Sequence, residues 1–273
     1  MRLCMFTPKE RRLYRGWPGR IEGDQVIQLA AQTLQSFFTG GGTARDHAEY
    51  RLEDVRLRPP VLCPPAVRDF YAFEQHVATA RAARGLEVPP EWYEQPAFYF
   101  SNPAAIFGPD DQVPYPEGTA ELDYELEVAA VIGAEGAIAG FTVMNDWSAR
   151  DLQRAEMRVG LGPAKGKDFA TSLGPVVVTV DEFDGSEGEM VARVNGEERS
   201  RGNLRDLHFG WERLHDHAAR NTELRAGDIL GSGTVGTGCI LELGDGRWLQ
   251  PGDVVELEVE GIGVLRNTVG PRP

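Results

Sequence analysis

The second half of the chain consists of short stretches in which apolar residues recur at every second position or run together briefly. Such stretches are typical of β-strands, and they occupy residues 175–180, 190–198, 227–233, 239–244 and 253–261. Few of the segments between them are long enough for a helix. This spacing predicts an α+β or mainly β core rather than alternating strand–helix units.

The middle of the chain predicts two longer strands and two helices. Residues 122–133 and 138–147 each predict a strand, and the later part of residues 66–85 predicts a helix. Ser148 follows the second strand and is expected to cap the next helix. Asp151 stands three residues further on, as in a capping box.

The first 60 residues are expected to form a small N-terminal domain ahead of a main domain over residues 61–273. Within this small domain, residues 12–29 predict two strands joined by a turn, and residues 30–38 predict a short helix. The proline-rich stretch over residues 56–65 is expected to be extended and to link the two domains.

Acidic side chains alternate with apolar ones where the strand over residues 122–133 begins. Side chains on a strand point to opposite faces in turn, so Asp123, Glu125 and Glu127 share one face, with neighbouring Cα atoms about 7 Å apart. The strand then becomes wholly apolar, and acids at the entrance to a buried stretch repel each other and are costly to desolvate. A hard divalent cation would resolve both problems, whereas an ordinary solvated strand face is the alternative.

Three further residues are candidates for the same chemistry. Asp146 ends the second strand and is a candidate third oxygen ligand, with a turn residue as the alternative. Asp69, Phe73 and His76 are spaced so that they share one helix face if that stretch is helical. His76 is then a candidate base, with a packed core histidine as the alternative. Asp69 has a cap or a surface acid as its alternative.

Composition narrows the class of protein. The formal net charge is −14, with 42 acidic against 28 basic residues, which argues against nucleic-acid binding. The chain has no run of eighteen apolar residues, and its apolar start is too short for a signal peptide. Three widely spaced cysteines predict reduced thiols in a cytoplasmic protein.

Three familiar catalytic motifs are not supported. The glycines over residues 231–236 satisfy the dinucleotide pattern, but a strand-like segment rather than a helix follows them. Residues 162–168 lack the glycine spacing of a phosphate loop and have Asp168 in place of Ser or Thr. The chain contains no G-x-S-x-G nucleophile elbow.

Several long motifs, in the same order along the chain, resemble the fumarylacetoacetate hydrolase family. The most specific are NDWSARDLQRAEM followed by GPAKGKDFATSLGP, and LDYELEVAAVIG. Others are DFYAFEQHV, VNGEERSRGN, LRAGDILGSGTVG and LQPGDVVELEVEGIGVLRN. The resemblance covers residues 54–269. It implies a mixed β-roll catalytic domain with a small N-terminal domain, and a homodimer.

The resemblance also implies a set of site residues. A divalent cation, Mg²⁺ first with Mn²⁺ or Ca²⁺ as alternatives, would be held by Asp69, Glu125, Glu127 and Asp146. His76 matches the family's base, and Glu242 matches the acid that orients it. Lys167 matches a position close to the metal centre, and substrate contacts are matched by Tyr71, Tyr99, Gln153 and Thr234. Lys167 and Gln153 would stabilise the oxyanion or enolate that forms.

The function implied is metal-dependent hydrolysis of a carbon–carbon bond in a β-diketone acid, such as fumarylacetoacetate, fumarylpyruvate or another acylpyruvate. Met157 stands where a substrate-contacting tyrosine is expected, so the mechanism carries over better than the substrate. Two alternatives stay open. The first is a decarboxylase, isomerase or dehydratase of the same family, for example an oxaloacetate decarboxylase, and the second is a non-catalytic metal-binding protein.

Overall fold

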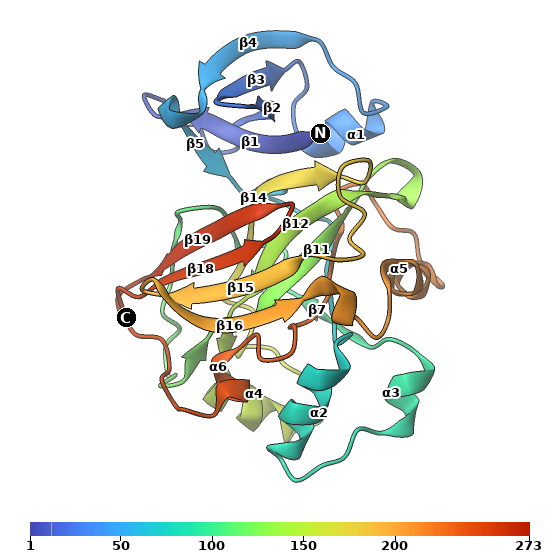
Figure 1. Ribbon diagram of the computed structural model, residues 1–273, viewed down its shortest axis with the longest axis vertical. Coiled ribbons are helices and arrows are strands. Elements are labelled where there is room, and N and C mark those ends of the chain that lie inside the picture. Colours follow the sequence, from blue (N-terminus) through green and yellow to red (C-terminus); the bar gives the residue numbers. More distant parts are fainter. Residues whose placement is uncertain (12) are drawn as a thin grey trace.

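A layer of strands at one end of the molecule is built from the first 58 residues (Figure 1). The computed structural model describes residues 1–11 and 13–273, so Arg12, the first residue of the expected strand pair, lies outside the described residues. Both expected strands and the short helix are confirmed, and the Thr33 side chain accepts from Ser36 N to cap that helix. The elements are β1 (Arg2–Pro8), β2 (Trp17–Glu22), β3 (Gln25–Leu29), α1 (Leu34–Thr39), β4 (Asp46–Arg51), a 3₁₀ turn (Leu52–Asp54) and β5 (Val55–Arg58).

This layer is joined to the main sheet by backbone pairing. The strands run in the order β4-β3-β2-β1, and β1 pairs with β14, with Leu3 opposite Val177. The other part of β1 pairs with β5, so the first three residues of the expected linker, 56–58, belong to a strand rather than to a free connection. The division near residue 60 stays a prediction.

The main sheet continues from β14 in the order β14-β12-β11-β17-β6-β7, with β8 added beside β14. Neighbours pair antiparallel except for β17 with β6 and β14 with β8. β11 is buried along its whole length. The strands are β6 (Val67–Phe70), β7 (Phe98–Ser101), β8 (Ile106–Phe107), β11 (Leu126–Ile132), β12 (Ile138–Asp146), β14 (Thr171–Thr179) and β17 (Ile229–Gly231).

A second sheet, in the order β16-β15-β18-β19-β9, packs against the first through β18 and β19 (Figure 1). Its strands are β9 (Gln112–Val113), β15 (Glu189–Val194), β16 (Glu197–Asn203), β18 (Val254–Val259) and β19 (Gly263–Val269). The core lies between the two sheets and includes Phe141 and Leu257. These sheets with few helices confirm the expected α+β class.

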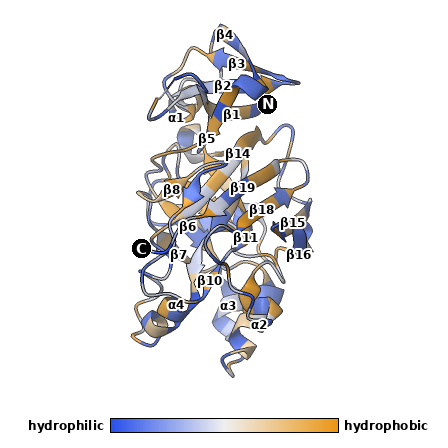
Figure 2. Cartoon of the chain, turned by 90° about the vertical axis from the view of Figure 1, so that its left-hand side faces the viewer, coloured by the Kyte–Doolittle hydropathy of each residue, from blue (hydrophilic) through white to orange (hydrophobic). Residues whose placement is uncertain are grey.

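Three of the helices lie far from the N-terminal strands. Figures 1 and 2 both place α2, α3 and α4 at the opposite end of the molecule. The helical segments are α2 (Glu74–Ala82), α3 (Pro90–Glu94), α4 (Arg150–Met157), α5 (Trp211–Ala219), α6 (Ile240–Leu243) and 3₁₀ turns at Ala134–Gly136 and Leu204–Asp206. Among the described helices, none is both long enough and apolar enough to cross a membrane.

Three local expectations were wrong. The strand expected over residues 122–133 is broken into β10 (Leu122–Asp123) and β11, and β10 pairs with β13 (Ser148–Ala149) instead of extending the main sheet. Ser148 therefore lies in a strand, and α4 begins after Ala149 without a side-chain cap. Asp151 instead accepts hydrogen bonds from Thr119 Oγ1 and Ala120 N.

Two further expectations fail where apolar patterning is ambiguous. The strand expected over residues 239–244 is the short helix α6, which ends at the left-handed Gly244. A run this short does not distinguish a buried strand from a buried helical turn. Asp69 and His76 do not share a helix face, because Asp69 lies in β6 and α2 starts only at Glu74.

Candidate active site

Four buried carboxylates meet at one end of the main sheet. Asp69 is on β6, Glu127 on β11, Asp146 ends β12, and Glu125 directly precedes β11. One carboxylate oxygen of each lies within 4.8 Å of the others, and each residue is at most 4% exposed. The alternation that placed Glu125 and Glu127 together holds across the strand break, but Asp123 is not a member of this cluster.

The electrostatics of the cluster suit a divalent cation. Burial and the charge of Asp146 raise the pKa of Asp69 well above its usual range, and burial and Asp69 do the same for Glu127. One oxygen of each of Asp69, Glu127 and Asp146 is buried without a hydrogen-bond partner. Oxygens of this kind are the ligands that Mg²⁺, Mn²⁺ and Ca²⁺ prefer, so the residues present fit a hard cation.

Lys167 offsets part of the negative charge. Its Nζ forms ion pairs with Glu125 Oε2 and Asp146 Oδ2. Burial alone would lower the pKa of Lys167, but these two carboxylates raise it, so the ammonium stays charged. Burial likewise works against ionised Glu125, yet Lys167 and Arg150 hold its pKa well below the usual range.

Two hydroxyl groups complete the surroundings of the cluster. Tyr99 Oη donates to Asp146 Oδ2 at 2.7 Å, and Thr234 Oγ1 donates to Glu127 Oε1 at 3.3 Å. Both residues were expected at substrate-contacting positions. In this structure each contacts a carboxylate of the cluster directly.

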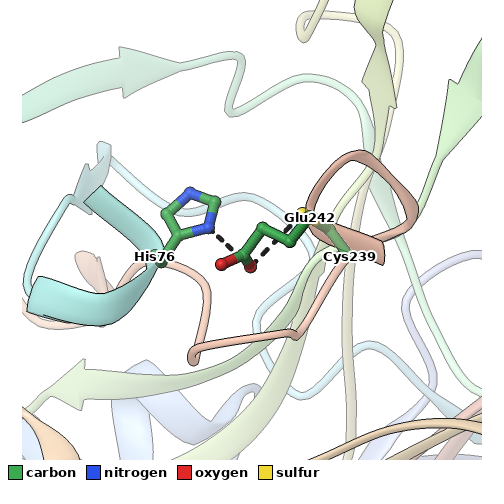
Figure 3. Close-up of side chains that lie close together, drawn as sticks. All are labelled: His76, Cys239 and Glu242. Atoms are coloured by element: carbon green, nitrogen blue, oxygen red, sulfur yellow. Dashed lines mark hydrogen bonds and ion pairs between the residues drawn. The ribbon is translucent and has the colours of Figure 1, made fainter. Parts of the chain in front are cut away.

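His76 and Glu242 lie together although 166 positions separate them in the chain. His76 Nδ1 is 2.8 Å from Glu242 Oε2, with side chains 6% and 1% exposed (Figure 3). The two atoms are in contact, yet Nδ1 has no hydrogen-bond partner of ordinary geometry. Catalytic hydrogen bonds are often poorly aligned without substrate. The second ring nitrogen of His76 points away from Glu242 (Figure 3).

A single cavity of about 980 Å³ connects these groups. Its polar end is lined by Asp69, Tyr71, His76, Tyr99, Glu125, Glu127, Gln153, Lys167 and Thr234. Asp146 and Glu242 are not part of this lining. Nine of the eleven expected site residues therefore line one cavity. The Tyr71 ring packs edge-on against His76 with centroids 5.2 Å apart, and burial raises the Tyr71 pKa to about 12.

The rest of the cavity wall is mainly apolar with a few arginines. Apolar positions are Ala80, Ala83, Leu86, Phe98 and Met157, and basic ones include Arg84, Arg154 and Arg158. A compartment of this kind suits an extended, partly apolar organic acid.

The sequence reasoning missed a buried connection between the two halves of the site. Arg150 Nη1 donates to Gln153 Oε1 at 3.1 Å and forms an ion pair with Glu125 Oε1 at 2.8 Å. Its Nε and Nη2 pair with Asp123 Oδ2, each at 2.8 Å. Asp123 accepts in turn from the backbone N–H groups of Ile240 and Leu241 at the start of α6. Asp123 and Arg150 thus tie the acid cluster to the helix that carries Glu242.

Residues 66–270 match the family described as "Fumarylacetoacetate (FAA) hydrolase C-terminal". Over 264 residues the chain is 30% identical to the oxaloacetate tautomerase YisK of Bacillus subtilis (strain 168), covering 91% of this chain and 84% of that protein. It is 27% identical over 307 residues to the fumarylacetoacetase of Arabidopsis thaliana, covering 88% of this chain and 72% of that one.

Solved structures agree with the sequence relatives. The fumarylacetoacetate hydrolase EaFAH from psychrophilic Exiguobacterium antarcticum superposes with a TM-score of 0.81 at 28% identity, covering both chains completely. The 5-carboxymethyl-2-hydroxymuconate delta-isomerase from Mycobacterium smegmatis gives a TM-score of 0.78 at 29% identity, also over both full chains. Together with the family match, these relatives show that the chain belongs to the fumarylacetoacetate hydrolase family.

Proposed function

We propose that this protein is a metal-dependent hydrolase that cleaves a carbon–carbon bond in a β-diketone acid, with an acylpyruvate as the substrate class. The observation that carries the proposal is the convergence of two groups on one cavity. These are a cluster of four carboxylates and a histidine held by a buried glutamate. Such a pair beside a cation site supplies both a base and a place where developing negative charge is stabilised.

Asp69, Glu125, Glu127 and Asp146 would hold the divalent cation, with Mg²⁺ as the first candidate and Mn²⁺ or Ca²⁺ as alternatives. When bound, such a cation acts as a Lewis acid toward oxygens of a 2-oxo acid and stabilises enolate charge on the leaving fragment. The partnerless oxygens of Asp69, Glu127 and Asp146 support this assignment.

His76 would act as the general base toward water. Its Nδ1 lies against Glu242, so the neutral ring carries its proton on Nδ1 and leaves Nε2 free to accept one. Glu242 then stabilises the imidazolium that forms, as the carboxylate does in a Ser-His-Asp triad. Hydroxide produced in this way attacks the distal carbonyl of the β-diketone.

Lys167 and Gln153 would stabilise the oxyanion or enolate. Two of the three donors of the Lys167 ammonium serve Glu125 and Asp146, which leaves one for the substrate. The Gln153 carbonyl oxygen accepts from Arg150, so its amide group is free to donate. Tyr71, Tyr99 and Thr234 border the same space and are proposed substrate contacts.

The size of the cavity favours a substrate larger than a four-carbon acid. A volume of about 980 Å³ with an apolar outer wall leaves room for the acyl group of an acylpyruvate. Fumarylpyruvate and fumarylacetoacetate are both of the proposed class.

A tautomerase or isomerase is the second candidate, because relatives with those names match over most of the chain. The same histidine could move a proton between carbon and oxygen of an enolisable 2-oxo acid without using water. Decarboxylation and dehydration of related acids are further outcomes that an assay would separate.

The experiment is product analysis on fumarylacetoacetate, several acylpyruvates and oxaloacetate, each with Mg²⁺ and with a chelator. Metal-dependent loss of enol absorbance that yields two acids supports the hydrolase. Conversion of the enol to the keto form without cleavage would identify the protein as a tautomerase instead. Release of carbon dioxide would identify it as a decarboxylase. No turnover of any compound, with Mg²⁺ bound, would favour a non-catalytic metal-binding protein.

We also propose that the protein is a cytoplasmic homodimer that binds a small 2-oxo acid as its substrate and does not bind nucleic acid. The net charge of −14 supports the last point. Light scattering at micromolar concentration tests the dimer, since a mass near the 30.0 kDa of one chain would contradict it.

A further inference from the structure

One cluster, which reaches the cavity through His76, combines sulfur, nitrogen and oxygen donors. Cys239 Sγ and His76 Nδ1 lie 3.6 Å and 2.8 Å from the same atom, Glu242 Oε2. Ligand atoms of all three residues lie within 4.8 Å of one another (Figure 3). Cys239 has no role in the proposed hydrolysis, yet it is fully buried beside the base.

Two atoms of the cluster lack hydrogen-bond partners. His76 Nδ1 and Glu242 Oε1 are both buried without one, on side chains 6% and 1% exposed. Buried polar atoms are nearly always satisfied by protein, water or an ion, so two partnerless atoms within one cluster of metal-ligating side chains indicate a missing ligand.

The local structure supports a three-ligand site. Cys239 immediately precedes α6 and Glu242 is the third residue within it, so the two side chains are three positions apart and lie on the same side of this single turn. His76 comes from α2, which packs against α6. Arg150, whose charge acts on Cys239, is already paired with Asp123 and Glu125.

We propose that His76, Cys239 and Glu242 form a second metal site, for a soft divalent cation such as Zn²⁺ or Cd²⁺, that inhibits the enzyme. Thiolate, imidazole and carboxylate are the ligands that zinc takes in proteins, with water in the fourth position. This donor set differs from the all-oxygen cluster beside it, which selects hard cations. The carboxylate cluster would therefore bind hard cations such as Mg²⁺, and the His76, Cys239 and Glu242 site would bind softer ones such as Zn²⁺.

Charge balance favours occupation of this site. The cation displaces one proton from the Cys239 thiol, and that proton leaves to solvent. One thiolate, one carboxylate and one neutral imidazole around a divalent cation then sum to zero charge. A neutral complex avoids the cost of burying a net charge.

Inhibition follows from the two nitrogens of His76, and this step alone rests on the proposed function. A cation on Nδ1 leaves the neutral ring with its proton on Nε2. His76 then donates at the position where hydrolysis needs an acceptor. Glu242 is diverted to the cation as well and no longer stabilises an imidazolium.

The test uses the thiolate-to-metal absorbance that appears in the ultraviolet when Cd²⁺ binds a cysteine. Protein is first saturated with Mg²⁺ so that the carboxylate cluster is occupied. Cys63→Ala removes the exposed thiol and is the reference protein. We expect the Cys63→Ala protein to give an absorbance band that corresponds to one metal-bound thiolate per chain. The double variant that combines Cys63→Ala with Cys239→Ser should lose that band. His76→Ala in the reference background should weaken Cd²⁺ binding by about 10- to 100-fold.

Zinc inhibition supplies the second readout, with each variant compared with its own zinc-free rate. The concentration of Zn²⁺ that halves turnover should rise about 10- to 100-fold on Cys239→Ser and stay unchanged on Cys63→Ala. Absence of the Cd²⁺ band in the Cys63→Ala protein, or an unchanged band after Cys239→Ser, would overturn the site whether or not the hydrolase proposal holds. A Cd²⁺ band without zinc inhibition would overturn only the inhibitory role.

Discussion

Replacing Asp123 by asparagine tests whether the two halves of the site are held together as described. Asp123 is fully buried and accepts four hydrogen bonds or ion-pair contacts. Two come from Arg150, and two come from the first backbone N–H groups of α6. Asparagine keeps the shape of the side chain, but it loses the charge and turns one acceptor into a donor.

The magnitude follows from what is left unpaired. The guanidinium of Arg150 loses its main counter-ion in a fully buried position, and breaking a buried pair from one side costs about 3–5 kcal/mol. For a chain of this size, about 2–4 °C of melting temperature corresponds to each kcal/mol. We therefore expect Asp123→Asn to lower the melting temperature by about 6–20 °C.

Function should be affected as well, because α6 carries Glu242. Loosening that helix misplaces the carboxylate that is proposed to orient His76, and a misplacement of about 1 Å costs about 10²-fold in rate. The loss should fall on kcat rather than on KM, since Asp123 does not line the substrate cavity. Thermal denaturation and steady-state kinetics measure the two effects.

The matched control is Glu197→Gln, which breaks an exposed pair with Arg247 at side-chain exposures of 58% and 53%. An exposed pair of this kind contributes at most about 1 kcal/mol. The role given to Asp123 and Arg150 would be refuted if Asp123→Asn changed the melting temperature no more than the control does and left kcat unchanged.

Three further predictions concern the carboxylate cluster. Glu127→Ala removes a proposed ligand and should weaken Mg²⁺ binding measured by calorimetry, and wild-type affinity would contradict the ligand assignment. Asp69 and Glu127 have raised pKa values in the folded protein, so the metal-free protein should lose stability as pH rises above their ordinary pKa values of 3.8 and 4.5. The increase in melting temperature on adding Mg²⁺ should therefore grow with pH. A shift independent of pH would argue against that coupling. Gly231→Ala should cost about 1–3 kcal/mol and weaken Mg²⁺ binding, because a Cβ there collides with Asp69 Oδ1, whereas Gly210→Ala, with open space around it, should do neither.

The strands and the shared face of the two glutamates could be predicted from the sequence, because both depend only on the order of neighbouring residues. The strand ending at Asp146 is nine residues long, and its last seven residues are buried. Glu125 and Glu127 were expected on one face, and the structure brings them together. Each of these features shows in fewer than ten consecutive residues.

The misses depend on contacts between distant parts of the chain. Nothing near Asp123 indicates that Arg150, 27 positions away, completes its charge, or that the N–H groups of α6 point at it. That pairing draws residue 123 away from the main sheet and breaks the expected strand. The helix α6 is only four residues long, too short for its period to differ visibly from a strand.

The division of roles between base and cation site is the central claim, and His76→Ala tests it most directly. Turnover of an acylpyruvate and Mg²⁺ affinity are both measured on one preparation of the variant. The two values are compared with those of the wild-type protein. We expect a loss of turnover of about 10²- to 10⁴-fold with Mg²⁺ affinity largely unchanged. Wild-type turnover in this variant would remove His76 from the mechanism, and a matching loss of Mg²⁺ binding would contradict the separation of the two sites.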